Sequence, residues 1–220
     1  MIGIILPTRG LVFTKVEEAI ERERNSTWEK TKVFRSHSLK IPAAYNILVD
    51  EALEEKDLTH LWFVEEDTVP PQGALLKLVD MSKPIACIDY GVNGWSCVAK
   101  DKKGEILWCG LGCTMIRKEV FYFLEKPWFR ADRVLRLNDW TWQKVEADKE
   151  YGGHDIYFFL KAREARFEIA QVEGECEHLK LDELGQREMN DGLHQISPKL
   201  KIEKYQIIEK GVDNYAQGDV

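Results

Sequence analysis

The fold of this chain is constrained most strongly by a short apolar run, which is followed by three acidic residues and a pair of prolines. Residues 59–71 read Thr-His-Leu-Trp-Phe-Val-Glu-Glu-Asp-Thr-Val-Pro-Pro. The run Leu61–Val64 is too short for a typical helix, and the prolines close it soon afterwards, which indicates a buried strand that ends in a loop. The acids therefore lie at the carboxyl end of a strand, where open α/β sheets bind their ligands.

The spacing of the three acids suggests which of them act together. Along an extended backbone alternate side chains share a face, which places Glu65 with Asp67 and turns Glu66 away. Two carboxylates on one face can hold a hard divalent cation. Three acids after a strand can also form a solvated turn, so both interpretations stay open on this stretch alone.

Strand and helix patterns alternate along the N-terminal part of the chain. Apolar runs predict strands at 2–6, 31–35, 61–64 and 84–90, and helical spacing predicts helices at 14–24, 42–53 and 72–80. This alternation is typical of an α/β domain with a mostly parallel central sheet and helices on both faces.

The pattern changes after residue 90. The segments 95–99 and 105–108 flank a polar stretch and predict a small hairpin insertion. Helices are expected from about residue 118 and at 156–165, and a final strand at 167–172, whereas 130–150 is charged and irregular. We expect one domain over residues 1–180 and a peripheral extension or mobile tail over 181–220.

Composition excludes several classes of protein. The 220 residues carry 38 acidic and 31 basic side chains, a formal net charge of −7, so bulk binding to nucleic acid is not expected. No apolar segment approaches the roughly 20 residues that cross a bilayer, and the N-terminal run is a strand pattern, not a signal peptide. The five cysteines form no Cys-x-x-Cys pair. We expect a soluble, cytoplasmic protein with reduced thiols and no transmembrane segment.

Four motifs carry a family resemblance. They are Leu6–Arg9, Phe63–Asp67, the segment from Gly110 to Phe129, and Gly152–Asp155 followed by His178. In this order, over about residues 2–180, the chain resembles the nucleotide-sugar glycosyltransferases of the GT-A fold, most of all the inverting family 2 type. The resemblance implies a Rossmann-like GT-A domain that moves a sugar from a nucleoside-diphosphate sugar to a hydroxyl acceptor.

The resemblance also implies a metal site. Glu65-Glu66-Asp67 stands where the family has an Asp-x-Asp motif, whose metal stabilises the negative charge on the leaving diphosphate. Asp67 and His178 are the expected ligands, with Glu65 as a third candidate although the family has Asp at that position. An imidazole beside carboxylates favours Mn²⁺ over Mg²⁺.

The remaining roles come from the same resemblance. Asp155 matches the general base that takes a proton from the acceptor hydroxyl, and His154, which replaces the usual Glu, is expected near the acceptor. Trp128 and Phe129 are expected to stack on the acceptor sugar. The expected donor-binding residues are Pro7, Thr8, Arg9, Asn46, Glu66, Gly110 and Gly112, the glycines by allowing close backbone approach.

Donor and acceptor stay open at this point. The donor is expected to be a UDP- or GDP-sugar, and the acceptor a glycan, a lipid-linked sugar or a small molecule. Because Glu65 and His154 depart from the family pattern, a non-catalytic nucleotide-sugar-binding module is an alternative. A sugar-phosphate nucleotidyltransferase needs a Gly-rich phosphate loop, which residues 7–11 match poorly, and a metal-dependent hydrolase is the last alternative.

Overall fold

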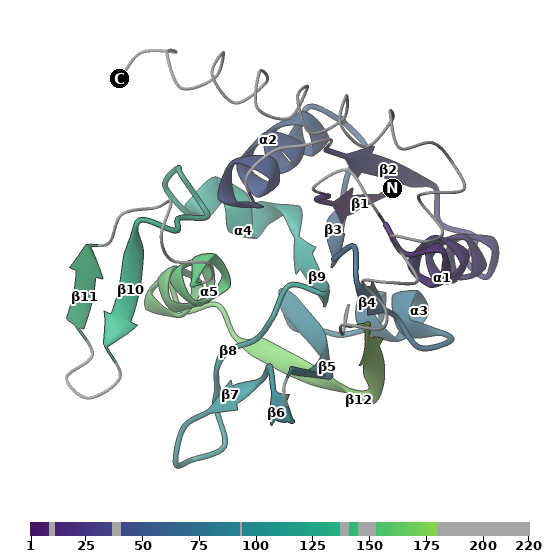
Figure 1. Ribbon diagram of the computed structural model, residues 1–220. Coiled ribbons are helices and arrows are strands. Elements are labelled where there is room, and N and C mark those ends of the chain that lie inside the picture. Colours follow the sequence, from purple (N-terminus) through teal and green to yellow (C-terminus); the bar gives the residue numbers. More distant parts are fainter. Residues whose placement is uncertain (9–11, 37–40, 93, 137–140, 145–152, 180–220) are drawn as a thin grey trace, which may run out of the picture.

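A central sheet organises the described part of the chain. The computed structural model describes residues 1–8, 12–36, 41–92, 94–136, 141–144 and 153–179. The strands of the main sheet are β1 (Ile2–Leu6), β2 (Thr31–Arg35), β3 (His60–Val64), β4 (Thr68–Val69), β5 (Ile85–Val92), β6 (Trp95–Ser96), β9 (Cys113–Arg117) and β12 (Ile169–His178). Their order is β2-β1-β3-β9-β5-β12-β4, with β6 paired to β5 (Figure 1).

The sheet is mixed, which corrects the expectation of a mostly parallel sheet. β1 runs parallel to β2 and β3, and β5 runs parallel to β12. β9 is antiparallel to both of its neighbours, β3 and β5. β4 pairs antiparallel with β12, and β6 pairs antiparallel with β5. The reason is that the connection from β5 to β9 contains short hairpin strands and no crossover helix, so β9 returns in the opposite direction.

These directions bring several strand ends to one edge of the sheet. β1 and β3 are parallel. Because β9 is antiparallel to both β3 and β5, β5 runs in the same direction as β3, and β12 is parallel to β5. The carboxyl ends of β1, β3, β5 and β12 therefore share an edge, and β9 begins there. This is the edge at which ligand binding was predicted.

Helices cover both faces of the sheet, as predicted. The described helices are α1 (Thr14–Asn25), α2 (Ile41–Leu53), α3 (Ala74–Val79), α4 (Lys118–Phe123) and α5 (His154–Glu164). Alternation along the strands divides the core into two clusters. Ile5 and Phe63 pack with α2, α4 and α5, whereas Ile4 and Trp62 pack with α1 and α3.

Two smaller sheets lie outside the main sheet. The strands β7 (Ala99–Lys100) and β8 (Ile106–Trp108) pair antiparallel, so a hairpin forms as predicted, but its first strand is shorter and later than the expected 95–99 because Trp95–Ser96 pairs with β5 instead. The strands β10 (Arg133–Arg136) and β11 (Thr141–Lys144) also pair, so the expectation of irregular structure is wrong there. This second hairpin is at the left edge of Figure 1. The expected extension over 181–220 lies outside the described residues.

All five cysteines are free. Among the described residues, no helix combines the length and the apolar character that a bilayer crossing requires.

Asn46 joins α2 to the loop after α4. Its Nδ2 donates to the carbonyl oxygens of Pro42 (2.8 Å) and Phe129 (2.9 Å), and its Oδ1 accepts from the backbone amides of Trp128 (3.0 Å) and Phe129 (3.2 Å). Trp128 and Phe129 are only 2% and 1% exposed. The expected roles of Asn46 toward the donor, and of the two rings toward the acceptor, are thus corrected to structural roles, because all three hold the core together.

Replacing Asn46 by Ala should lower the free energy of unfolding by about 2 kcal/mol, since the backbone amides of Trp128 and Phe129 would lose their acceptor. Urea unfolding followed by fluorescence measures the change. Asn25→Ala, at the exposed end of α1, is the matched control and should change stability by less than about 0.5 kcal/mol. An Asn46→Ala protein as stable as the wild type would show that this amide does not hold the loop.

Candidate functional site

The chain turns sharply after β3, which differs from the expected extended backbone. The amide of Thr68 donates to the carbonyl oxygen of Glu65 (3.2 Å), so the three acids occupy a turn. The short strand β4 then pairs with the end of β12, with Thr68 opposite His178, and the amide of Leu179 donates to the carbonyl oxygen of Asp67 (2.7 Å). This pairing brings Asp67 and His178 together from distant parts of the sequence.

Asp67 and His178 form a polar pair at the sheet edge. The Asp67 Oδ2 and His178 Nε2 atoms are 3.7 Å apart, and the side chains are 26% and 15% exposed. The other ring nitrogen of His178, Nδ1, is buried and has no hydrogen-bond partner among the described residues. Within the same residues no three His, Cys, Asp or Glu side chains gather closely enough to hold a metal ion. In the described part of the chain, Asp67 and His178 are therefore the stronger candidate ligands here.

Glu65 is held between two tyrosines. Its Oε1 accepts from the Tyr45 hydroxyl (2.8 Å) and its Oε2 from the Tyr90 hydroxyl (3.3 Å). Burial raises the pKa of Glu65 to about 7, the negative charges of Asp67 and Asp155 add to this effect, and the hydrogen bonds from the tyrosines oppose it. Both carboxylate oxygens are thus engaged by the protein, and Glu65 is a weaker candidate ligand than Asp67.

Gly110 and Gly112 make room for Tyr90. A Cβ atom on Gly110 would lie 2.6 Å from the Tyr90 Cζ, and one on Gly112 would lie 2.6 Å from the Thr68 Oγ1 and 2.9 Å from the Tyr90 ring. The amide of Gly112 also donates to the Tyr90 hydroxyl (3.3 Å). The close approach that glycine allows here is to a tyrosine of the same chain. Sequence reasoning missed Tyr90, for which the paired glycines were the only signal.

Asp155 and His154 begin α5. Gly153 precedes the helix with a φ of 79°, which favours glycine, and the Asp155 Oδ1 accepts from the amide of Ile156 (2.8 Å). The His154 ring is 8% exposed and stacks on Tyr45 with centroids 5.2 Å apart. Burial lowers the pKa of His154. The His154 ring therefore packs between α5 and Tyr45, the tyrosine that donates to Glu65. This buried position differs from the expected contact with the acceptor.

The expected donor-binding turn is only partly described. Pro7 and Thr8 follow β1 and are buried, and the amide of Thr8 donates to the Ser36 Oγ (3.1 Å). Glu66 is buried beside α1, where its carbonyl oxygen accepts from the amide of Phe13 (3.1 Å). Arg9 lies outside the described residues. Pro7, Thr8 and the acids after β3 share the same sheet edge.

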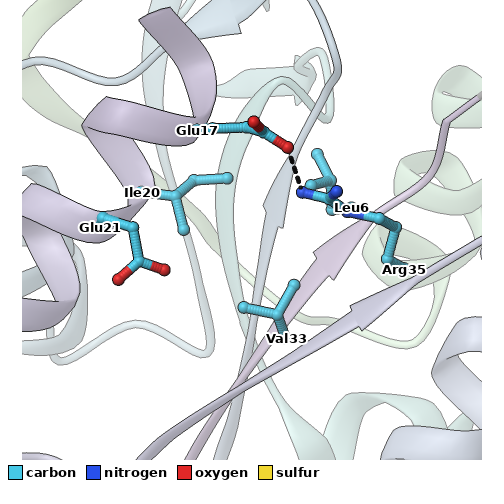
Figure 2. Close-up of a pocket in the computed structure, with 6 residues that line it drawn as sticks. All are labelled: Leu6, Glu17, Ile20, Glu21, Val33 and Arg35. Carbon is cyan, nitrogen blue, oxygen red and sulfur yellow. Dashed lines mark hydrogen bonds and ion pairs between the residues drawn. The ribbon is translucent and has the colours of Figure 1, made fainter. Parts of the chain in front are cut away.

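A separate pocket of about 200 Å³ lies beside the ends of β1 and β2. Figure 2 shows Glu17, Ile20 and Glu21 from α1 on one side, with Leu6, Val33 and Arg35 on the other. An ion pair between Glu17 and Arg35 (2.8 Å) spans it. Because Arg35 already pairs with Glu17 and Glu21 pairs with Arg24 of the same helix, we assign this pocket no ligand.

Known proteins resemble this chain in structure alone. No protein-family model and no curated protein matches it. It is similar to the protein A197 from STIV, with 20% identity and a TM-score of 0.59 over 81% of this chain and 85% of that one. It is also similar to the catalytic domain of a Drosophila beta1,4galactosyltransferase 7 in complex with xylobiose, with 13% identity and a TM-score of 0.54 over 81% and 70%. The chain thus shares its fold with the catalytic domain of a glycosyltransferase.

Proposed function

We propose that this chain is a metal-dependent glycosyltransferase that moves a sugar from a UDP- or GDP-sugar to a hydroxyl acceptor with inversion. One observation carries the proposal. Glu65 is linked through Tyr90 to His178, which faces Asp67, and through Tyr45 to His154, the neighbour of Asp155. The fold shared with a galactosyltransferase catalytic domain supports the reaction class.

The donor set at this edge fits a divalent cation. Asp67 offers a carboxylate oxygen and His178 an imidazole nitrogen, a combination that suits Mn²⁺ better than Mg²⁺. A bound cation would act as a Lewis acid toward the negative charge on the leaving diphosphate. The negative charges of Asp67 and Asp155 would repel a diphosphate that arrived without a cation. Among the described residues, Asp67 and His178 are the ones that would hold the cation.

Asp155 is the residue we assign to the proton transfer. The acceptor oxygen attacks the anomeric carbon on the face opposite the diphosphate, a new C–O bond forms, and the bond from the sugar to the phosphate breaks. The hydroxyl proton passes to the Asp155 carboxylate, which the amide of Ile156 holds through Oδ1 (2.8 Å). The position in the first turn of α5 favours a negative side chain.

Metal dependence is testable by calorimetry of UDP and GDP binding with Mn²⁺ and with chelator. Binding is expected only with Mn²⁺. Asp67→Asn should weaken Mn²⁺-dependent nucleotide binding, because a direct metal ligand is lost. The loss should exceed the roughly 10–100-fold effect of mutating a residue that only contacts a metal ligand. Glu66→Gln, the matched control in the same turn, should have a much smaller effect. Equal affinity in chelator would refute the metal requirement.

The proposed base is testable by kinetics. Asp155→Asn keeps the size of the side chain but cannot take up the proton, so sugar transfer should fall by roughly 10²–10⁴-fold while Mn²⁺-dependent nucleotide affinity is retained. Nucleotide release from a panel of UDP- and GDP-sugars, with glycan and small-molecule acceptors, measures the rate. Asp50→Asn, on the exposed surface of α2, is the control with unchanged transfer.

Two results would redirect the proposal. Near-normal transfer by Asp155→Asn would exclude Asp155 as the base and with it the inverting mechanism drawn above. Tight donor binding by the wild type, without transfer to any acceptor of the panel, would favour a nucleotide-sugar-binding module over an enzyme.

A further inference from the structure

We infer that Tyr90 is a positioning residue that holds the His178 imidazole in the orientation a metal ligand needs, an inference that rests on the proposed function. The Tyr90 and His178 rings stack, with centroids 5.6 Å apart and an angle of 15° between their planes. Tyr90 is 5% exposed and belongs to β5, whereas His178 ends the neighbouring strand β12. The contact thus joins two strands at the edge that carries the site.

Strand register places the two rings together. β5 and β12 are parallel, and Tyr90 lies opposite Cys176. His178 is two residues further along β12 and so projects from the same face as Cys176. This makes His178 the diagonal neighbour of Tyr90, a distance that aromatic side chains can span.

The Tyr90 ring is itself fixed on its other sides. Its hydroxyl donates to the Glu65 Oε2 (3.3 Å) and accepts from the amide of Gly112 (3.3 Å). Gly110 lies so close that a Cβ there would approach the Tyr90 Cζ to 2.6 Å. Hydrogen bonds and steric contact therefore leave the ring little freedom, and it can act as a rigid support for its neighbour.

His178 needs such a support because the usual one is missing from the described residues. A histidine that binds a metal through one ring nitrogen normally donates its other N–H to a carboxylate or carbonyl, which sets the ring orientation. The His178 Nδ1 is buried and has no such partner among the described residues, while Nε2 faces Asp67 at 3.7 Å. Stacking on Tyr90 supplies the orientation that a hydrogen bond would otherwise give.

Mn²⁺ titration of three variants tests this role. Tyr90→Met fills the space without a ring and should weaken Mn²⁺ binding by roughly 10–100-fold, the effect of losing an outer-shell partner. Tyr90→Phe keeps the stacked ring and should lose less. Phe121→Leu, a core change among Phe63, Trp128 and Phe158, is the matched control: it should lower the Tm without changing Mn²⁺ affinity. Equal losses of affinity in all three variants would overturn the inference.

The position of His178 can also be measured without metal. In NOE spectra of the histidine ring protons, assigned with His178→Gln, Tyr90→Met should weaken the NOEs from the His178 ring to the Asp67 and Thr68 side chains, and Tyr90→Phe should keep them. Wild-type NOE intensities in Tyr90→Met would overturn the inference even if that variant binds Mn²⁺ weakly. A wild-type protein that binds no Mn²⁺ would refute the metal part of the proposed function, and the NOEs would still decide whether Tyr90 holds His178.

Discussion

The burial of one carboxylate, that of Glu65, determines how this edge of the sheet is built. A buried carboxylate without partners costs several kcal/mol, whereas each hydrogen bond to a charged group contributes about 1.5–3 kcal/mol. Tyr45 from α2 and Tyr90 from β5 supply these bonds. Three elements distant in sequence, β3, α2 and β5, are thus tied at the place where β3 ends.

Each tyrosine also contacts a histidine in a different half of the candidate site. Tyr45 stacks on His154, next to Asp155 at the start of α5. Tyr90 stacks on His178, which faces Asp67. The proposed chemistry divides in the same way, with proton transfer on the α5 side and the diphosphate on the β12 side. Glu65, which is hydrogen-bonded to both tyrosines, links the two halves.

Local patterns predicted the fold better than they predicted the site. The runs at 2–6 and 31–35 became β1 and β2 at their predicted bounds, because short apolar runs between turns leave few alternatives. The two-residue strand β4 and the last part of β12 depend on pairing between residues about 110 positions apart, which no local pattern contains. Tyr90 lies in an apolar strand and resembles any core aromatic. Trp128 and Phe129 looked accessible in a loop, but Asn46 draws that loop into the core.

The length of the Glu65 side chain has a consequence for how such a protein can diverge. An aspartate at this position is one methylene shorter and would withdraw the carboxylate from both tyrosine hydroxyls. It would leave a gap beside the space that Gly110 and Gly112 reserve for Tyr90. Positions 45, 65, 90, 110 and 112 therefore form one physically coupled set. In related chains a change at one of them should be accompanied by substitutions at the others, so their covariation would trace this framework where overall sequence identity no longer does.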